Sequence, residues 1–117
     1  MNTMMQTMSE SKFEEAIEFL GRCLKEKGLN VSKIILFGSQ VKGKTSEGSD
    51  VDILIISEDF QGKDIFERAR LTKDAEILTL KKFMMPLDIV TLTSEEFESN
   101  KSIVAEYARK GKVMYAA

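Results

Sequence analysis

The spacing of apolar and polar residues along the chain predicts two long amphipathic helices. From Ser9 to Gly28, apolar residues recur every three or four positions with Glu and Lys between them, and a glycine is typical of a helix C-terminus. From Asp64 to about Lys82 the spacing is again helical, although the apolar stripe is less regular. The apolar positions are Phe13, Ala16, Ile17, Leu20, Cys23 and Leu24 in the first helix, and Ile65, Phe66, Ala69, Ala75, Ile77, Leu78 and Leu80 in the second.

Three short apolar runs predict β-strands at Val31–Phe37, Val51–Ile56 and Leu87–Leu92. The second run is apolar on both faces except for Asp52, as expected of a buried central strand. Between the first two strands, residues 43–50 are turn formers throughout. The chain therefore returns quickly from the first strand to the second.

The C-terminal part of the chain predicts further short elements. Thr93 and Glu96 fit a capping box for a helix that begins near Ser94. Another helix is expected from about Ser102 to Lys110, and residues 112–115 would add a short terminal strand. This order of elements predicts an α/β (α+β) fold in which helices pack against one sheet.

Length and charge limit the classes of protein to consider. A chain of 117 residues is expected to form one domain at residues 9–117, preceded by a short mobile leader at residues 1–8. The formal net charge of -2 gives no overall basic field, so direct nucleic-acid binding is not expected. No apolar segment approaches the ~20 residues that span a bilayer, and a cytoplasmic protein without membrane contact is the expectation.

The absence or scarcity of certain residue types further limits the reactions that this chain could catalyse. The chain has no histidine, which excludes His-based triads, two-His metal sites and imidazole general bases within this polypeptide. Its single cysteine, Cys23, falls on the first apolar stripe and is expected to be a packed side chain. Hydrolysis or group transfer would therefore depend on carboxylates, hydroxyls, Lys or Arg.

The segment "GSQVKGKT", residues 38–45, matches the phosphate-loop pattern G-x-x-x-x-G-K-[ST]. In that arrangement a long helix begins at the Lys-Ser/Thr pair and points its positive end at the phosphates. Here only five residues, 46–50, separate Thr45 from the next strand, whereas a crossover helix needs about ten or more. The match is therefore interpreted as coincidental.

A second interpretation uses the whole segment from Gly38 to Asp52. Gly38 and Ser39 can approach an anion closely, and Gly43 permits a sharp reversal of the chain. Asp50 and Asp52 are two residues apart at the start of a strand, so their carboxylates are expected on one face. Two such carboxylates near a phosphate site suit Mg²⁺. If the third strand neighbours the second, Asp88 can complete a three-aspartate cluster that holds two metal ions.

The segment "FGSQVKGKTSEGSDVDILII" resembles the signature of DNA-polymerase-β-like nucleotidyltransferases, and "PLDIV" resembles the strand that carries their third carboxylate. The short length and the C-terminal segment resemble the minimal nucleotidyltransferases that are encoded beside HEPN-domain proteins. The resemblance implies a mixed sheet with flanking helices. It also implies transfer of a nucleoside monophosphate, AMP from ATP or the equivalent from another NTP, to a hydroxyl group.

The resemblance also implies site residues and a partner. Gly38 and Ser39, with Lys42 and Gly43 in the same loop, would bind the phosphates. Asp50 and Asp52 would ligate two Mg²⁺ ions, and Asp88 would ligate one and help take the proton of the acceptor. In the paired systems the nucleotidyltransferase is an antitoxin that adds AMP to a tyrosine of the HEPN toxin.

Two departures and two alternatives remain. Gln40 and Lys42 replace residues that are usual in the family, which leaves phosphate affinity and nucleotide choice open. One alternative is a binding module that neutralises its partner by sequestration. The other is a nucleotidyltransferase for a small molecule, although such relatives usually carry an additional domain for the acceptor. For any of these functions, a dimer or a hetero-oligomer is compatible with the sequence.

Overall fold

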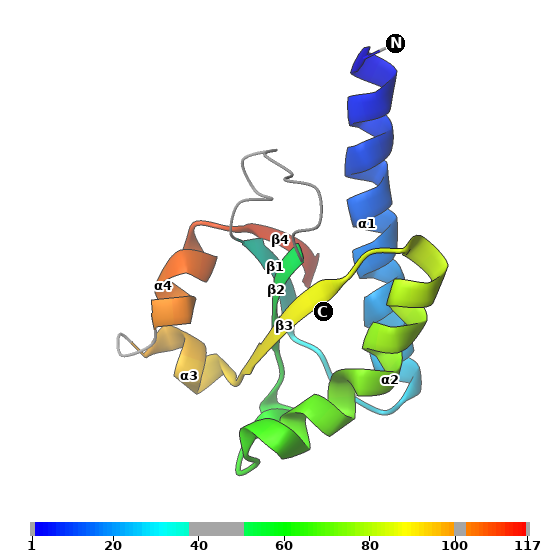
Figure 1. The fold of residues 1–117 in the computed structure, drawn as a ribbon. Helices are drawn as coiled ribbons and strands as arrows, with labels where there is room; N and C mark the ends of the chain where they lie inside the picture. The colour runs from blue at the N-terminus through cyan, green and yellow to red at the C-terminus, as the bar shows by residue number, and fades with distance from the viewer. Residues whose placement is uncertain (1, 38–50, 100–102, 117) are drawn as a thin grey trace.

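The computed structural model describes residues 2–37, 51–99 and 103–116, with only the backbone described for residues 2–11. Its elements form a central sheet with helices on both sides (Figure 1). In chain order they are α1 (Asn2–Glu26), β1 (Lys33–Phe37), β2 (Val51–Ile56), the short 3-10 helix η2 (Glu58–Phe60), α2 (Ile65–Phe83), β3 (Leu87–Leu92), α3 (Ser94–Glu98), α4 (Ile103–Arg109) and β4 (Lys112–Ala116).

The four strands lie in the order β3-β2-β1-β4. β1 pairs antiparallel with both β2 and β4, whereas β2 and β3 are parallel. The predicted mixed sheet is therefore confirmed, and the bounds of β2 and β3 are those expected from the sequence. β2 is central and almost wholly buried, in agreement with its continuous apolar run.

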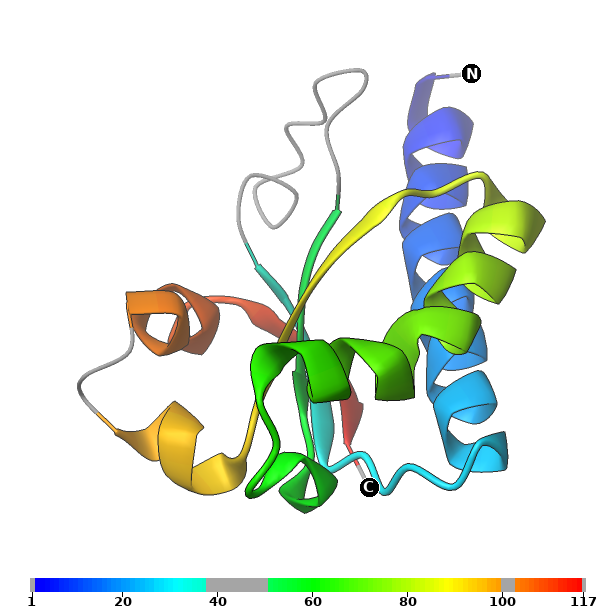
Figure 2. The same ribbon diagram turned by 60° about the horizontal axis from the view of Figure 1, so that its bottom comes forward.

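The two helix pairs cover opposite faces of this sheet (Figures 1 and 2). On the α1 and α2 side, the larger core contains Ile34 and Leu36 of β1 together with Ile53 and Ile55 of β2. On the α3 and α4 side, alternate residues of the same strands form a smaller core, which contains Ile35, Leu54, Ile56 and Ala108. Side chains of a strand alternate between faces, so two cores share one sheet.

The apolar stripe predicted for the first helix is confirmed in α1. Ala16, Ile17, Leu20 and Leu24 are buried, and Cys23 is packed among them. Burial raises the pKa of the Cys23 thiol, as expected for a packed side chain. The helix begins at Asn2 rather than Ser9, so residues 2–8, which the sequence assigns to a leader, continue it.

The apolar stripe predicted for the second helix is wrong as a description of the buried face of α2. Of the seven apolar positions expected there, only Ala75 is buried. The buried residues are Arg68, Thr72, Ala75 and Thr79, which recur at helical spacing. Each threonine hydroxyl donates to a carbonyl of its own helix, Thr72 to Ala69 at 3.2 Å and Thr79 to Ala75 at 2.8 Å. These bonds satisfy the hydroxyls, so small polar side chains can be buried at low cost.

The N-termini of α2 and α3 are fixed by capping boxes. Asp64 and Glu67 form a capping box at the start of α2, and Thr93 and Glu96 form the predicted one at α3. After α4, the chain turns at Gly111 into β4. A Cβ atom at Gly111 would overlap the carbonyl oxygen of Leu36 in β1, so only glycine fits this close approach. In the described part of the chain, no helix is long and apolar enough to cross a bilayer.

Candidate active site

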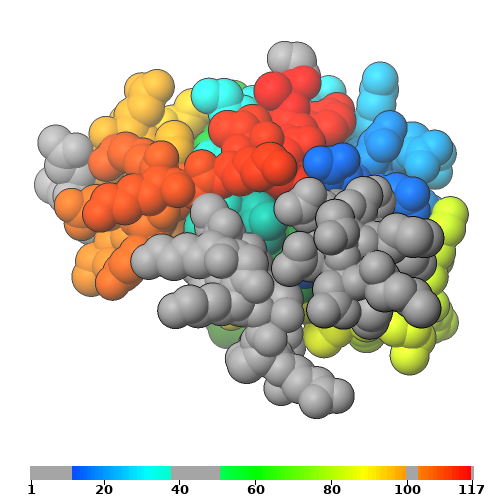
Figure 3. Space-filling view, turned by 90° about the horizontal axis from the view of Figure 1, so that it is seen from above, coloured from blue at the N-terminus to red at the C-terminus, as the bar shows by residue number. Residues whose placement is uncertain are grey.

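The candidate site lies at the end of the sheet where β1 ends and β2 and β3 begin. In the parallel pairing of β2 and β3, Asp52 is directly opposite Asp88. In the antiparallel pairing of β1 and β2, Asp52 is opposite Phe37, the last residue of β1. We call this end of the sheet, with Phe37, Asp52 and Asp88, the catalytic edge. Figure 3 looks onto this end of the molecule, with α4 and β4 on one side and α1 and the α2–β3 connection on the other.

Asp52 and Asp88 lie on the same face of the sheet. Leu54 of β2 and Val90 of β3, two residues further along each strand, both pack in the core beneath α3 and α4. Because alternate residues of a strand share a face, both aspartates are on that side as well. Asp52 is half-buried and Asp88 is exposed, so one carboxylate is held within the edge and the other faces solvent.

This pair of carboxylates fits a divalent cation. Neighbouring strands are about 4.8 Å apart, so two aspartates in register can reach a common ligand. Two ionised carboxylates at this separation repel each other unless a cation lies between them, and Mg²⁺ prefers carboxylate ligands together with phosphate oxygens. Within residues 12–37, 51–99 and 103–116, no group of three or more potential metal ligands occurs. Asp50, the third predicted carboxylate, lies outside the described residues.

The predicted phosphate-binding residues cannot be placed in the same way. Gly38, Ser39, Lys42 and Gly43 all lie in 38–50, outside the described residues. Their position in the sequence nevertheless connects them to the catalytic edge, because the segment follows Phe37 directly and precedes Val51. The two described residues that flank the segment, Phe37 and Val51, both lie beside Asp52.

Strand pairing decides between the two interpretations of the segment "GSQVKGKT". A Walker-type loop joins a strand to a helix that crosses over to a parallel strand. β1 and β2 are instead adjacent and antiparallel, with only residues 38–50 between them. The structure therefore agrees with a return connection and excludes the Walker arrangement.

Two contacts that the sequence does not indicate hold the catalytic edge together. The Val51 N–H donates to the Pro86 carbonyl at 3.0 Å, which ties the start of β2 to the residues before β3. On the other side of β2, Gly111 packs against Leu36, one residue before the end of β1. These contacts join the residues that flank Asp52 and Asp88 to neighbouring strands.

A cationic residue of β4 also reaches this end of the sheet. Lys112 pairs with Leu36 in the antiparallel register of β1 and β4. Its ammonium lies 4.0 Å from the carboxylate of Glu14 in α1, so the side chain is directed to the α1 side of the sheet. It therefore lies on the face opposite Asp52 and Asp88.

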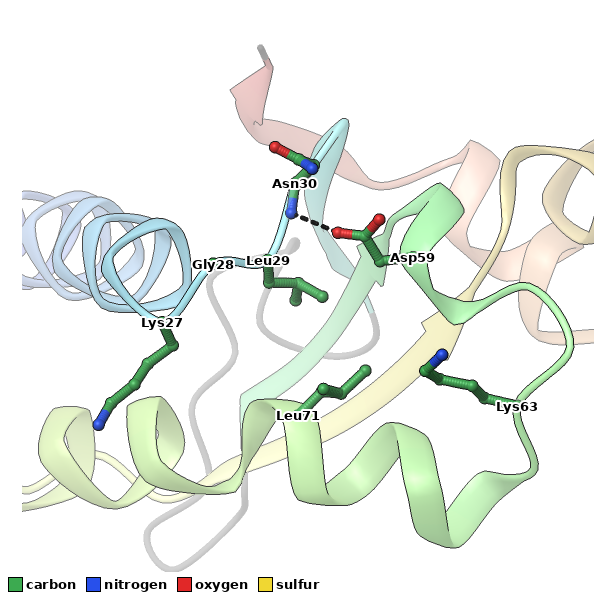
Figure 4. A pocket seen from close by; sticks show the side chains of 7 residues that line it. All are labelled: Lys27, Gly28, Leu29, Asn30, Asp59, Lys63 and Leu71. Carbon is green, nitrogen blue, oxygen red and sulfur yellow. Dashed lines mark hydrogen bonds between the residues drawn. The ribbon is translucent and has the colours of Figure 1, made fainter.

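A pocket lined by described residues lies at the other end of the molecule. Figure 4 shows this hollow of about 280 Å³, lined by Lys27, Gly28, Leu29, Asn30, Asp59, Lys63 and Leu71. The backbone N–H of Asn30 donates to the Asp59 carboxylate at 2.8 Å, across the hollow. This bond ties the connection before β1 to the end of β2, and none of the predicted site residues lines the hollow. We assign it a structural role.

An ion pair at the same distal end joins α2 to α3. The Arg68 guanidinium binds both carboxylate oxygens of Glu96, at 2.7 and 3.2 Å. It also donates to the carbonyls of Lys63 and Thr91, at 2.9 and 3.3 Å. The hydrogen bond from Arg68 is the main reason that the pKa of Glu96 is lowered. Because these groups satisfy each other far from Asp52 and Asp88, the pair stabilises the fold.

Comparison with known proteins agrees with this geometry. The family described as "Nucleotidyltransferase domain" matches residues 17–110. A protein of Methanocaldococcus jannaschii named "Putative protein adenylyltransferase MJ1305" is 39% identical over 57 residues. That match covers 49% of this chain and 38% of the relative, so the chain spans less than half of the relative's length.

Two solved structures have a similar fold. A toxin-antitoxin crystallised with AMP-PNP contains a chain that is 21% identical, with a TM-score of 0.62 over 89% of this chain and 73% of that chain. A structure described as a "putative minimal nucleotidyltransferase" is 20% identical, with a TM-score of 0.55 over 92% of both chains. At identities of 21% and 20%, the similarity shows that this chain has the same fold as these structures, and it shows the fold alone.

Proposed function

Because the chain belongs to the nucleotidyltransferase domain family, we propose that it transfers a nucleoside monophosphate from an NTP to a hydroxyl group of a partner protein. The observation that carries the proposal is the register of β2 and β3, which places Asp52 directly beside Asp88 at the catalytic edge. The absence of histidine throughout the sequence fits a reaction that depends on carboxylates.

The chemistry follows from the charge of the site. Asp52 and Asp88, together with Asp50, would hold Mg²⁺, which when bound neutralises the triphosphate and lowers the pKa of an attacking hydroxyl. Gly38, Ser39, Lys42 and Gly43 would bind the phosphates. The acceptor oxygen forms a bond to the α-phosphorus, the bond to the bridging oxygen breaks, and pyrophosphate leaves. Asp88 would help take the proton of the acceptor, which is supported by its being the more exposed of the two described carboxylates.

We further propose ATP as the nucleotide and a HEPN-domain toxin as the partner, for which this chain is the antitoxin. The support is the resemblance of the sequence to minimal nucleotidyltransferases, the name of the archaeal relative and the toxin-antitoxin with AMP-PNP. The described residues form one sheet with its flanking helices. A protein acceptor would bring its own binding surface.

The test mixes the purified protein with Mg²⁺, each NTP in turn and the protein encoded beside it, and follows the intact mass of both proteins. We expect nucleotide-sized additions to the partner with ATP. Asp52→Asn and Asp88→Asn should each lower the rate by roughly 100-fold or more, because each removes a carboxylate that would hold the cation that neutralises the phosphates in the transition state. Asp74→Asn is a matched control, since Asp74 is exposed and, among the residues that the structure describes, its ion pair is with Lys27 at the surface, 3.7 Å away.

The outcome also separates catalysis from sequestration. Equal additions by the wild type and by both site variants would refute the catalytic assignment. If the partner is neutralised without nucleotide and equally well by Asp52→Asn, then stable complex formation is the activity. Chelation of Mg²⁺ with EDTA should stop the additions as completely as the Asp52→Asn substitution does.

A further inference from the structure

The outward face of α2 carries the apolar residues that the sequence leads one to expect on its buried face. Phe66, Ile77, Leu80 and Met84 are exposed to 69, 38, 40 and 77%. Their spacing of 11, 3 and 4 residues places them on one line along the helix, opposite Arg68, Thr72, Ala75 and Thr79. We call these four residues the α2 stripe. At 1.5 Å per residue it is about 25 Å long, which is the length of several helical turns.

Cations lie within and beside the α2 stripe, because Arg70 and Lys73 fall on the same line between Phe66 and Ile77. Arg70, Lys73 and Lys81 lie on the same side of the helix, because they are three or four residues from members of the stripe. Among the described residues, none of these three forms an ion pair. α2 carries three carboxylates: Glu67 caps the helix at Asp64, Asp74 pairs with Lys27, and Glu76 is half-buried, so the three cations outnumber the free acidic groups on this side. The face is therefore both apolar and positively charged.

The stripe also leads toward the catalytic edge. Met84 is the C-cap of α2, and its N–H donates to the Leu80 carbonyl at 2.7 Å. Asp88 follows only four residues later, and the Pro86 carbonyl between them accepts the bond from Val51 at the start of β2. Figure 1 shows the end of α2 passing into β3 at this end of the sheet. A segment bound along the stripe would thus have one end beside the catalytic edge.

We propose that the α2 stripe binds an acidic amphipathic helix of the acceptor protein. The occupant is inferred from complementarity. A straight line of apolar side chains with helical spacing fits the anchors of a second helix, and free cations beside that line favour carboxylates in the partner. This inference rests on the proposed function, because it takes the acceptor of the nucleotide to be a protein.

The first experiment measures binding without nucleotide or metal, so it does not depend on catalysis. The probes are two fluorescent helical peptides with the same leucine stripe, one flanked by Glu and the other by Lys. Fluorescence anisotropy should show binding of the Glu peptide, at least tenfold weaker binding of the Lys peptide, and weaker binding as salt increases. Equal binding of both peptides, or of neither, would overturn the proposal.

A matched pair of variants locates the binding face. Ile77→Glu introduces a carboxylate into the α2 stripe, whereas Leu78→Glu places it on the next residue, about 100° around the helix. Leu78 is exposed to 45%, which is close to the value for Ile77, so both changes should be tolerated similarly by the fold. We expect at least a tenfold loss of Glu-peptide binding with Ile77→Glu and less than a twofold loss with Leu78→Glu. Circular dichroism and the Tm confirm that both variants fold, and equal losses would overturn the assignment.

The second experiment separates docking from catalysis. With the acceptor protein, Ile77→Glu should raise KM at least tenfold with little change in kcat, while Asp52→Asn should abolish transfer and leave peptide binding unchanged. Transfer that fails for the wild type while binding persists would refute the proposed function alone. An unchanged KM with Ile77→Glu would refute the docking surface alone. If sedimentation shows that the wild type dimerises and Ile77→Glu is monomeric, the occupant is a second copy, and the proposal of an acceptor helix is overturned.

Discussion

α1 and α2 pack against each other and cover the same face of the sheet, yet they bury opposite kinds of residue. α1 buries a continuous apolar stripe that includes Ile17, Leu20 and Leu24. α2 buries Thr72, Thr79 and most of Arg68, whereas its stripe of Phe66, Ile77, Leu80 and Met84 is exposed and, of its large apolar side chains, only Leu71 and Phe83 pack against the larger core. The apolar pattern of a helix shows which residues gain from burial. It does not show whether this chain or another molecule buries them.

α2 can bury polar residues because other interactions fix its position. Its two threonine hydroxyls are satisfied within the helix, and Arg68 makes four hydrogen bonds to Lys63, Thr91 and Glu96. The guanidinium carbon of Arg68 also lies 5.8 Å from the centre of the buried Phe60 ring. The helix therefore attaches through these polar contacts in addition to the packing of Leu71 and Phe83, whereas α1 attaches mainly through buried apolar area.

The largest effect in this comparison is expected for Leu20→Ala in α1. The side chain of Leu20 is fully buried in the larger core, so truncation leaves a cavity and removes apolar burial. The free energy of unfolding should fall by about 2 to 5 kcal/mol. Urea denaturation followed by circular dichroism measures the change. A loss below about 1 kcal/mol would show that α1 is not the principal apolar support of the sheet.

The same contrast shows what the sequence can predict. The bounds of β2 and β3 follow from their apolar runs and from the turn residues around them. The stripe of α1 and the Thr93 capping box are also local patterns, and the structure confirms both. The buried face of α2 is not predictable in this way, because burial of Thr72 and Thr79 depends on hydrogen bonds that become apparent only in the folded helix.

In the candidate site, too, the sequence predicts the local features, whereas the long-range contacts appear only in the structure. The sequence identifies Asp52 and Asp88 as candidates, but their adjacency depends on which strands pair and in which register. Strand order is set by long-range packing and cannot be read from either strand alone. The contacts of Val51 with Pro86 and of Gly111 with Leu36 are likewise long-range. The roles of Gly38, Ser39, Lys42, Gly43 and Asp50 stay predictions.

A smaller effect on stability is expected when acid protonates the carboxylate of Glu96, which forms an ion pair with the buried Arg68 of α2. The hydrogen bond from Arg68 lowers the pKa of Glu96 below its ordinary value of 4.5. The ionised Glu96 therefore contributes stability that is fully present above about pH 4.5, and this stability is lost as the pH falls through the lowered pKa.

Glu96→Gln tests this contribution while keeping a residue that can complete the capping box. Because 42% of the Glu96 side chain is exposed, the difference in stability between wild type and variant near pH 7 should be under about 1 kcal/mol. That difference should shrink as the pH is lowered, as measured by urea denaturation at several pH values. A constant difference at all pH values would show that the Arg68–Glu96 pair does not contribute to the acid sensitivity of the fold.

The smallest effect is expected for Leu80→Ala in α2, the counterpart of Leu20→Ala in α1. Leu80 is 40% exposed, and alanine is at least as favourable as leucine within a helix. The free energy of unfolding should change by no more than about 0.5 kcal/mol. Affinity for the Glu-flanked peptide should nevertheless fall, because the substitution removes an apolar anchor from the α2 stripe. A loss of stability comparable to that of Leu20→Ala would mean that Leu80 supports the fold of the isolated chain. The apolar stripes of α1 and α2 would then contribute similarly to stability. A neutral effect on stability combined with weaker binding would show that α2 keeps its apolar residues for a partner.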